Sequence, residues 1–304
     1  MSLVSIDQLT VDDVVRILEQ AEHWEYLLDK GVKSNVLSGK ILGNIFYEPS
    51  SRTSSSFHAA MLNLGGSVIP ITATASSIAK GETLEDTVRT MASYCDILVL
   101  RHPEGGAAKS AASCSPVPVI NAGDGICEHP TQALLDLYTI KKLIGKVENV
   151  TITMVGDLRH GRTVHSLTKL LNMFGAKQLH FISPESLQMP AGLIEQLKVP
   201  YTISNNLASV ISTSDVLYVT RVQKERFSSL EEYELVKNAF IITPTTLLAA
   251  KNDMIVMHPL PRTTEIHPDV DSDPRAAYFK QMRHGVFVRM AILASSLGVP
   301  DYSK

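Results

Sequence analysis

YEPSSRTSSSF, at residues 47–57, separates an apolar segment from a segment with helical periodicity. The apolar segment, residues 41–47, is too short for a helix and predicts a strand that ends near Glu48. Apolar side chains then recur at helical spacing at Phe57, Ala60, Met61 and Leu64. The pair Gly65-Gly66 supplies a helix stop. This strand-turn-helix order sets the pattern for the chain, which we predict to be of the α/β class.

The turn inside this stretch is rich in hydroxyl groups. Ser50, Ser51 and Thr53 can cap the following helix or bind a ligand at its N-terminus. Free amide groups at a helix N-terminus favour a phosphate or a carboxylate, and the planar guanidinium of Arg52 matches the geometry of such an oxyanion. Taken alone, the stretch is equally compatible with an ordinary capped helix that carries a surface arginine. The rest of the chain decides between these interpretations.

The first half of the chain alternates short apolar runs with helical patterns. Further strands are expected at 67–72, 96–100 and 117–121, and helices at 11–28, 83–93 and 107–113. The helix at 83–93 opens with a Thr-x-x-Asp capping pattern. Such alternation predicts a mostly parallel sheet that is covered by helices on both faces.

A longer helical pattern at 130–144 is the expected hinge between two domains, and the alternation resumes after it. Strands are expected at 150–158, 179–182, 216–220 and 254–257, and helices at 161–174 and 273–297. The last helix is long enough to return to the first domain. We therefore predict two doubly wound domains with mostly parallel sheets, linked by helices. Their expected ranges are 1–130 plus 285–304 and 131–284.

Length and composition narrow the class of protein. The 304 residues, of which 44% are hydrophobic, suffice for two domains with sizeable cores. The net charge of -3 gives no indication of a nucleic-acid or membrane partner. Cys95, Cys114 and Cys127 lack metal-site spacing and fit a reducing compartment. Because neither a run of about 18 apolar residues nor a signal peptide is visible, we expect a cytoplasmic protein.

Polar clusters follow the predicted strands, which is where open parallel sheets bind their ligands. One arginine at a strand end is usually a solvated rim residue. Four arginines, however, are predicted to face one crevice: Arg52, Arg101, Arg162 and Arg221. Guanidinium groups that are brought together repel one another unless an anion lies between them. The sequence therefore predicts a polyanionic substrate.

The sequence lacks the motifs of nucleotide-binding, covalent-catalytic and metal sites. Residues 156–161 contain no G-x-G-x-x-G dinucleotide loop, and residues 80–83 lack the glycine spacing of a P-loop. No serine or cysteine occupies a nucleophile elbow, and no metal-binding motif is visible. We therefore expect no cofactor, no metal and no covalent intermediate.

Eight motifs, in order along nearly the whole chain, resemble those of the aspartate carbamoyltransferase family. They are FYEPSSRTSSSF, AKGETLEDT, LRHPEGGAA, NAGDGICEHPTQALLDL, VGDLRHGRTVHSL, YVTRVQKER, VMHPLPR and DPRAAYF. The resemblance implies transfer of the carbamoyl group of carbamoyl phosphate to the α-amino group of L-aspartate, in de novo pyrimidine biosynthesis. The SSRTS form, where many bacterial chains have STRTR, is more similar to the domain of multifunctional animal-type proteins. The resemblance leaves open how the chain occurs. It could be a free-standing enzyme, a part of a multifunctional polypeptide or a part of a regulatory assembly.

The resemblance also implies the roles of individual residues. The phosphate of carbamoyl phosphate would be bound by Ser50, Ser51, Arg52 and Thr53. The carbamoyl oxygen would be contacted by Thr53, Arg101 and His129, and the carbamoyl amine side by Gln132. The carboxylates of aspartate would be held by Arg162, Arg221 and Gln223, with backbone groups of Leu260 around the reacting centre. Ser76 and Lys80 would reach the site from a neighbouring subunit of a homotrimer, and the catalytic residues would be Thr53, Lys80, Arg101 and His129.

His129 precedes Pro130 and the long predicted helix, whose dipole disfavours a positive charge at its N-terminus. We therefore expect a neutral imidazole that donates a hydrogen bond to the developing oxyanion. Two alternatives stay open. Ornithine carbamoyltransferase shares the phosphate motif but normally has a His-Cys-Leu-Pro motif, where this chain has His258-Pro259-Leu260-Pro261. The other alternative is a non-catalytic scaffold or anion-binding module derived from the family.

Overall fold

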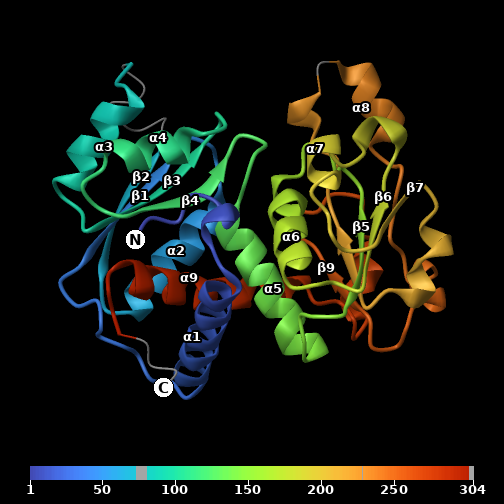
Figure 1. Cartoon of the computed structure of the whole chain (residues 1–304), viewed down its shortest axis with the longest axis horizontal. Coiled ribbons are helices and arrows are strands. Elements are labelled where there is room, and N and C mark those ends of the chain that lie inside the picture. Colours follow the sequence, from blue (N-terminus) through green and yellow to red (C-terminus); the bar gives the residue numbers. More distant parts are fainter. Residues whose placement is uncertain (73–80, 228, 301–304) are drawn as a thin grey trace. The chain divides into compact units, whose positions relative to one another are not determined.

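The computed structural model describes residues 1–72, 81–227 and 229–300. It contains two compact units, Met1–Tyr138 with Arg283–Lys304 and Thr139–Met282. The divisions fall within two long helices, α5 (Pro130–Ile144) and α9 (Tyr278–Ser296) (Figure 1). The predicted α/β class with two parallel sheets is confirmed.

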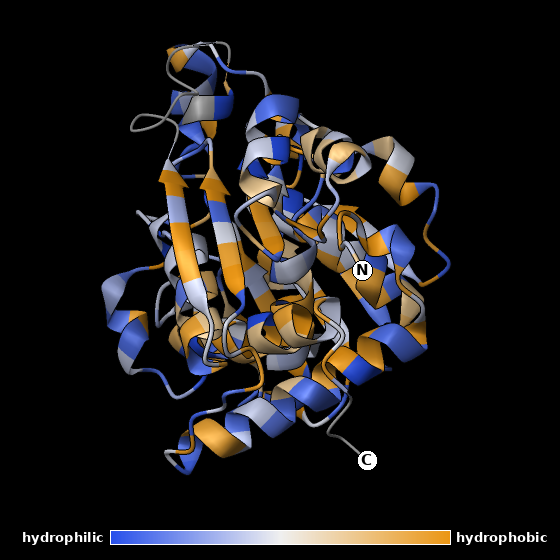
Figure 2. Ribbon diagram, turned by 90° about the vertical axis from the view of Figure 1, so that its left-hand side faces the viewer, coloured by the Kyte–Doolittle hydropathy of each residue, from blue (hydrophilic) through white to orange (hydrophobic). Residues whose placement is uncertain are grey.

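The first unit is built on a four-stranded sheet in the order β2-β1-β3-β4, with every strand pair parallel. Its strands are β1 (Ile41–Phe46), β2 (Ser67–Thr72), β3 (Ile97–His102) and β4 (Val119–Asp124). The edge strand β2 contains Pro70, which lacks an amide hydrogen and is tolerated at a sheet edge. At the opposite edge, Leu3 pairs with Ile120 of β4. The strands β1, β3 and β4 are mostly buried, whereas the edge strand β2 has no buried residue. Figure 2 shows the hydrophobic residues of this sheet.

The helices of the first unit include α1 (Val11–Asp29), α2 (Ser51–Asn63), α3 (Leu84–Ala92) and α4 (Ala107–Cys114). Of these, α2, α3 and α4 contact the strands of its sheet. The apolar faces of α3 and α4 pack on β1, β3 and β4 in one core cluster. The predicted cap of α3 is present, because the hydroxyl of Thr83 accepts a hydrogen bond from the backbone N–H of Asp86. Residues 51–53, the first turn of α2, thus come directly after β1.

The second unit contains a five-stranded parallel sheet in the order β7-β6-β5-β8-β9. Its strands are β5 (Thr151–Val155), β6 (Gln178–Ile182), β7 (Tyr201–Ser204), β8 (Val216–Val219) and β9 (Ile255–Met257). Sequence patterns did not predict β7, because this edge strand is mostly exposed and lacks a long apolar run. Short helices α7 (Ala191–Ile194) and α8 (Leu230–Val236) and the longer α6 (Arg162–Met173) belong to this unit.

Helix α9 begins later than predicted, at Tyr278 instead of residue 273. The intervening residues extend the second sheet: the backbone N–H of Val256 donates to the carbonyl of Arg275, and that of Ala277 donates to the carbonyl of Val256. Residues 275–277 therefore cover the free edge of β9, a long-range pairing that helical periodicity cannot reveal. Short 3₁₀ turns complete the two units at Ile6–Gln8, Glu185–Leu187, Leu207–Ser209, Ile211–Thr213, Lys224–Arg226, Thr246–Ala249 and Pro268–Ser272. Over the part of the chain that is described, no helix combines the length and apolar content needed to cross a membrane.

Candidate active site

The predicted anion cradle lies at the N-terminus of α2. Ser50 is the N-cap residue, yet its side chain makes no capping hydrogen bond. Its hydroxyl instead accepts a hydrogen bond from Nη1 of Arg101 at 3.3 Å. Thr53 is buried in the first turn, while Ser51 and Arg52 are exposed. A helix start without a side-chain cap leaves amide groups and hydroxyls for an anionic ligand, which favours the anion site over the ordinary capped helix.

Arg101 joins the ends of β1 and β3. Its Nε donates to Oε2 of Glu48 at 3.1 Å, and its carbonyl accepts from the backbone N–H of Tyr47 at 2.8 Å. The Arg101 and Glu48 side chains are only 17% and 20% exposed. The two hydrogen bonds and this partial burial hold the guanidinium in one geometry beside Ser50, as a preorganised oxyanion site requires.

His129 and Gln132 lie at the start of α5 and are both buried. The carbonyl of His129 accepts the backbone N–H of Gln132 at 3.0 Å, so the imidazole belongs to the residue that opens the helix. Nε2 of Gln132 donates to Oδ1 of Asp136 at 2.8 Å. The helix therefore presents one imidazole and one oriented amide within its first turn.

A buried cation that the sequence analysis did not identify lies next to α2. Arg289 of α9 is 3% exposed, and its Nη1 donates to the hydroxyl of Ser56 at 2.5 Å. Its guanidinium carbon lies 5.0 Å from the centre of the Phe57 ring. Burial lowers the pKa of Arg289 to about 9, against the opposing effect of the Asp136 carboxylate. The sequence feature that could have revealed Arg289 is its position as the single charged residue in the apolar run at 286–294.

In the second unit, the loop after β5 is tied to the end of β8. The hydroxyl of Thr220 donates to the carbonyl of Val155 at 3.1 Å. Gly156 has φ +117°, and a Cβ at this position would lie 2.3 Å from the carbonyl oxygen of Thr220. Only glycine fits this close approach of two strand ends. The arrangement places the loop at 157–161 beside the residues that follow β8.

This loop and the segment after β8 carry the predicted aspartate-binding side chains. Arg162 is the first residue of α6 and is buried, and the N-cap Gly161 offers no side chain for capping. Nε2 of Gln223 donates to the carbonyl of His160 at 3.3 Å. His160 is itself bound by Asp157, which accepts from its backbone N–H at 2.9 Å. Arg162 and Gln223 are thus positioned from one loop.

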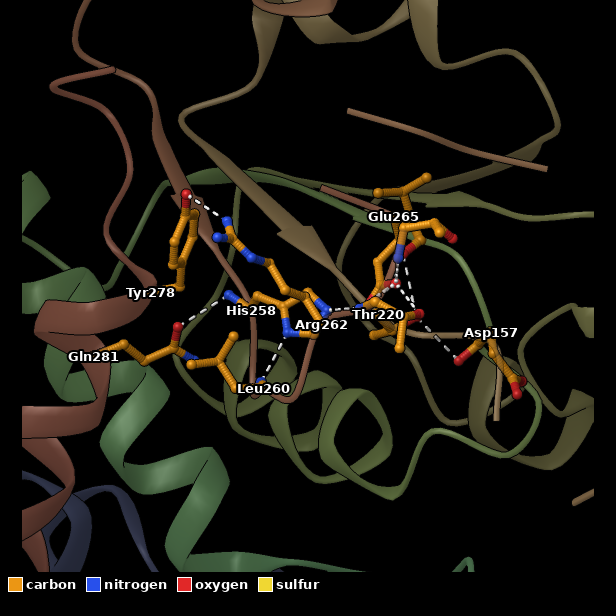
Figure 3. Close-up of polar contacts among 11 residues, drawn as sticks. Asp157, Thr220, His258, Leu260, Arg262, Glu265, Tyr278 and Gln281 are labelled. Carbon is orange, nitrogen blue, oxygen red and sulfur yellow. Dashed lines mark hydrogen bonds and ion pairs between the residues drawn. The ribbon is translucent and has the colours of Figure 1, made fainter. Parts of the chain in front are cut away.

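Leu260, the remaining predicted site residue of this unit, follows β9 with φ +53°. Its backbone N–H donates to Nδ1 of His258 at 2.7 Å, and Nε2 of His258 lies 2.8 Å from Oε1 of Glu265 (Figure 3). His258 and Glu265 are almost completely buried. Burial lowers the pKa of His258, and the positive charge of Arg221 contributes a smaller effect in the same direction. Arg221 therefore acts on the same group of residues.

Each unit therefore holds one group of predicted site residues. The first contains Ser50, Ser51, Arg52, Thr53, Arg101, His129 and Gln132, and the second contains Arg162, Arg221, Gln223 and Leu260. Ser76 and Lys80 lie outside the described residues. Within the described ranges, no group of three or more His, Cys, Asp or Glu side chains could hold a metal ion. Burial raises the pKa of the Cys95 thiol to about 11, so this thiol is not an activated nucleophile.

The two units match two family models. The carbamoyl-P binding domain of aspartate/ornithine carbamoyltransferase matches residues 1–142, and the Asp/Orn binding domain matches residues 148–296. A structure of aspartate transcarbamoylase from Trypanosoma cruzi in complex with carbamoyl phosphate and aspartate has 46% sequence identity and a TM-score of 0.93. The similarity covers 97% of this chain and 96% of that chain.

Two relatives show how the chain compares in length. The aspartate carbamoyltransferase catalytic subunit of Archaeoglobus fulgidus is 54% identical over 293 residues, which are 96% of this chain and 97% of the relative. The multifunctional protein pyr1-3 of Dictyostelium discoideum is 51% identical over 299 residues, which are 97% of this chain but 13% of the relative. Identity at this level over whole catalytic subunits places the chain in the aspartate carbamoyltransferase family.

Proposed function

We propose that the protein transfers the carbamoyl group of carbamoyl phosphate to the α-amino group of L-aspartate, giving N-carbamoyl-L-aspartate and phosphate for pyrimidine synthesis. The observation that carries the proposal is the anion cradle of the first unit. There an uncapped helix N-terminus meets the partly buried guanidinium of Arg101 at Ser50. The solved relative in complex with carbamoyl phosphate and aspartate supports the same pair of substrates.

The reaction requires attack of the aspartate amine on the carbamoyl carbon, followed by expulsion of phosphate from a tetrahedral oxyanion. Carbamoyl phosphate is already activated, so the protein supplies no nucleophile. Its main task is to orient two anions, which is worth up to about 7 to 11 kcal/mol. Donors that face the developing oxyanion add about 3 kcal/mol each. Arg101 and His129 are the proposed donors.

The phosphate would be bound by the first turn of α2, through Ser50, Ser51, Arg52 and Thr53. The amine side of the carbamoyl group would be bound by Gln132, whose NH₂ group is already committed to Asp136. Its Oε1 is consequently the atom presented to a substrate donor. In the second unit, the carboxylates of aspartate would be bound by Arg162, Arg221 and Gln223. Leu260 would contribute backbone groups around the reacting centre.

Aspartate is favoured over ornithine by the residues that follow β8 and β9. Arg221 and Gln223 supply donors for a second carboxylate, whereas the side-chain ammonium of ornithine would require an acceptor. The segment after β9 contains Pro259 where the ornithine enzymes carry a cysteine. Phosphate release from carbamoyl phosphate, measured with aspartate and with ornithine, tests the assignment. Release with ornithine alone would contradict it, and no release with either would favour a non-catalytic scaffold.

We further propose a cytoplasmic homotrimer in which Ser76 and Lys80 complete the site of a neighbouring subunit. The motif AKGETLEDT, which contains Lys80, supports this through its resemblance to the family. Native mass measurement tests the trimer. Mixing Lys80→Ala and Arg52→Ala subunits tests sharing, because a mixed trimer would regain one intact site. Verified mixed trimers without recovered activity would contradict a shared site. Fractionation of the source cells tests the location.

A further inference from the structure

The backbone at Leu260 adopts a conformation that leucine rarely takes. Among the described residues, only Leu260 and Asn149 combine a side chain with a φ in the left-handed region. Asparagine tolerates this region through its short polar side chain, but leucine does not. Such a conformation persists only where the surrounding structure enforces it, and it frequently marks a functional site. The contacts of the segment around Leu260 therefore hold its backbone in this conformation.

His258 supplies that enforcement. Its Nδ1 accepts the backbone N–H of Leu260 at 2.7 Å, and its own backbone N–H donates to Oε1 of Gln281 at 3.0 Å. On the other side of the ring, Nε2 lies 2.8 Å from Oε1 of Glu265. Figure 3 shows the imidazole between these groups. The ring is thus fixed at both nitrogen atoms.

These contacts determine where the proton of the imidazole lies. Because Nδ1 accepts a hydrogen bond, it carries no proton, so Nε2 carries the proton and donates it to Glu265. The second carboxylate oxygen of Glu265 accepts the backbone N–H groups of Thr263 at 3.0 Å and of Thr264 at 3.1 Å. Glu265 is therefore an acceptor that is itself held by the backbone. A protonated Nδ1 would break the bond to Leu260.

We propose that His258 and Glu265 form a positioning pair for the acceptor-substrate half of the site. Neutral His258, oriented by Glu265, holds Leu260 in its left-handed conformation. Pro259 and Pro261 have no backbone N–H, and that of Leu260 is committed to His258. Residues 259–261 consequently offer only carbonyl oxygens, which suit the amine of the acceptor substrate rather than its carboxylates. This inference rests on the proposed function, in which the reacting nitrogen is an amine.

Two substitutions of His258 separate its two hydrogen bonds. The Oδ1 of His258→Asn reproduces the position of Nδ1 and still accepts from Leu260. The Nε2 of His258→Gln reproduces the position of the ring Nε2 and still donates to Glu265, but it leaves the Leu260 N–H without an acceptor. We expect His258→Gln to lower kcat/KM for aspartate at least about ten-fold more than His258→Asn, because the first variant releases Leu260.

The comparison needs two internal references. The dissociation constant for carbamoyl phosphate, measured by calorimetry, should change less than about two-fold in both variants, because its proposed ligands belong to the first unit. His180 is a matched buried histidine of β6, with Nδ1 2.7 Å from the hydroxyl of Thr202. The two variants His180→Asn and His180→Gln should have the same kcat/KM for aspartate as each other. Equal kinetics of the two His258 variants would overturn the proposal.

A measurement on the unmodified protein keeps the proposal testable if the variants fail to fold. Nitrogen-15 NMR of histidine-labelled protein at pH 7 should show His258 as the neutral tautomer with its proton on Nε2. An imidazolium, or a proton on Nδ1, would overturn the positioning pair. The proposed function fails separately, if the unmodified protein releases no phosphate from carbamoyl phosphate in the presence of aspartate.

Discussion

The side-chain amide of Gln132 donates from Nε2 to Oδ1 of Asp136, one turn further along α5, at 2.8 Å. A carboxylate can only accept, so this bond fixes which end of the amide faces Asp136. Both side chains are buried, with Asp136 completely so. Gln132 therefore reaches the proposed carbamoyl group with its oxygen atom, which matches the two N–H groups of a carbamoyl nitrogen.

We expect Asp136→Asn to lower kcat/KM for carbamoyl phosphate by about ten-fold, the equivalent of one buried hydrogen bond of about 1.4 kcal/mol. Asparagine can face Gln132 with either its oxygen or its NH₂ group, so the orientation of the amide is no longer fixed. Steady-state kinetics measure the effect. The control is Tyr138→Phe, which removes a partly buried hydrogen bond from the same helix to Glu25. Equal losses in the two variants would contradict the orienting role.

Substitutions of Arg289 and Asp136 should affect the stability of the protein and its activity differently. Arg289→Met alone removes a buried cation whose charge acts on the completely buried Asp136, and it should cost about 3 to 5 kcal/mol in the free energy of unfolding. Replacing both, as Arg289→Met with Asp136→Leu, should recover most of that loss because neither charge then remains buried. The double variant should still lack normal turnover, since Gln132 has lost its acceptor. Urea denaturation and kinetics test both statements, and a double variant less stable than the single one would contradict them.

Gly156 offers a test of the tie between β5 and β8. We expect Gly156→Ala to destabilise the second unit by at least about 2 kcal/mol, because its Cβ would lie 2.3 Å from a carbonyl oxygen at a φ of +117°. The control is Gly192→Ala in α7, where nothing lies within 4 Å of the added Cβ. That substitution should be neutral or stabilise by up to about 1 kcal/mol. Thermal unfolding monitored by circular dichroism distinguishes the two.

The His258–Glu265 pair should make the second unit sensitive to acid. Burial lowers the pKa of His258 below its usual 6.5, so the unfolded chain takes up a proton first and stability falls as the pH drops below about 6.5. Burial raises the pKa of Glu265, but the hydrogen bonds from His258 and from backbone N–H groups outweigh it and lower that pKa to about 2. That contribution is present above about pH 4.5 and is lost as the pH falls towards 2. The positive charges of Arg221 and Arg262 act on His258 in the same direction as burial.

Glu265→Gln separates the two contributions. It should flatten the dependence of the urea midpoint on pH below about 4.5, because no carboxylate remains to be protonated at this position. His258→Asn should instead flatten the dependence just below about pH 6.5. Unchanged profiles in both variants would show that other groups control the acid response.

Binding of an anion to the first unit should raise its thermal stability. A ligand at 100 times its dissociation constant adds about 2.7 kcal/mol to the free energy of unfolding. Phosphate or carbamoyl phosphate should therefore raise Tm, and Arg101→Lys should reduce the increase, since lysine cannot contact Glu48 and Ser50 with one planar group. Lys40→Arg, in an exposed pair with Asp96, is the control. An equal increase of Tm in both variants would remove Arg101 from the anion site.

Local patterns predicted most strands and the longer helices, because their apolar periodicity coincides with burial. The pattern at 130–144 matches α5, which is buried from residue 130 to residue 140, and that at 96–100 overlaps β3, which is buried from residue 97 to residue 100. Pairing between distant segments was not predictable in the same way. The start of α9 was wrong because residues 275–277 pair with β9, and β7 was missed because an exposed edge strand has little apolar signal.

The residues of the candidate site also differ in how far the sequence could predict them. Polar residues at strand ends, such as Arg101, are visible in the sequence because they interrupt apolar runs. The acceptors that orient them are not visible, since Glu265 follows His258 through a loop whose path depends on tertiary structure. Arg289 is separated from Ser56 by 233 positions in the sequence. Candidate site residues could therefore be proposed from the sequence, whereas the groups that hold them required the fold.

Every sheet edge of the described chain is protected against pairing with another molecule. Residues 2–4 close the β4 edge, where the backbone N–H of Leu3 donates to the carbonyl of Val119 and the carbonyl of Leu3 accepts from Asn121. Residues 275–277 close the edge of β9, Pro70 interrupts β2, and β7 is short. Exposed edges are templates for intermolecular strand addition. Removal of the first few residues would therefore expose a hydrophobic strand as a nucleus for aggregation, so preparations of this protein need an intact N-terminal segment to stay dispersed at high concentration.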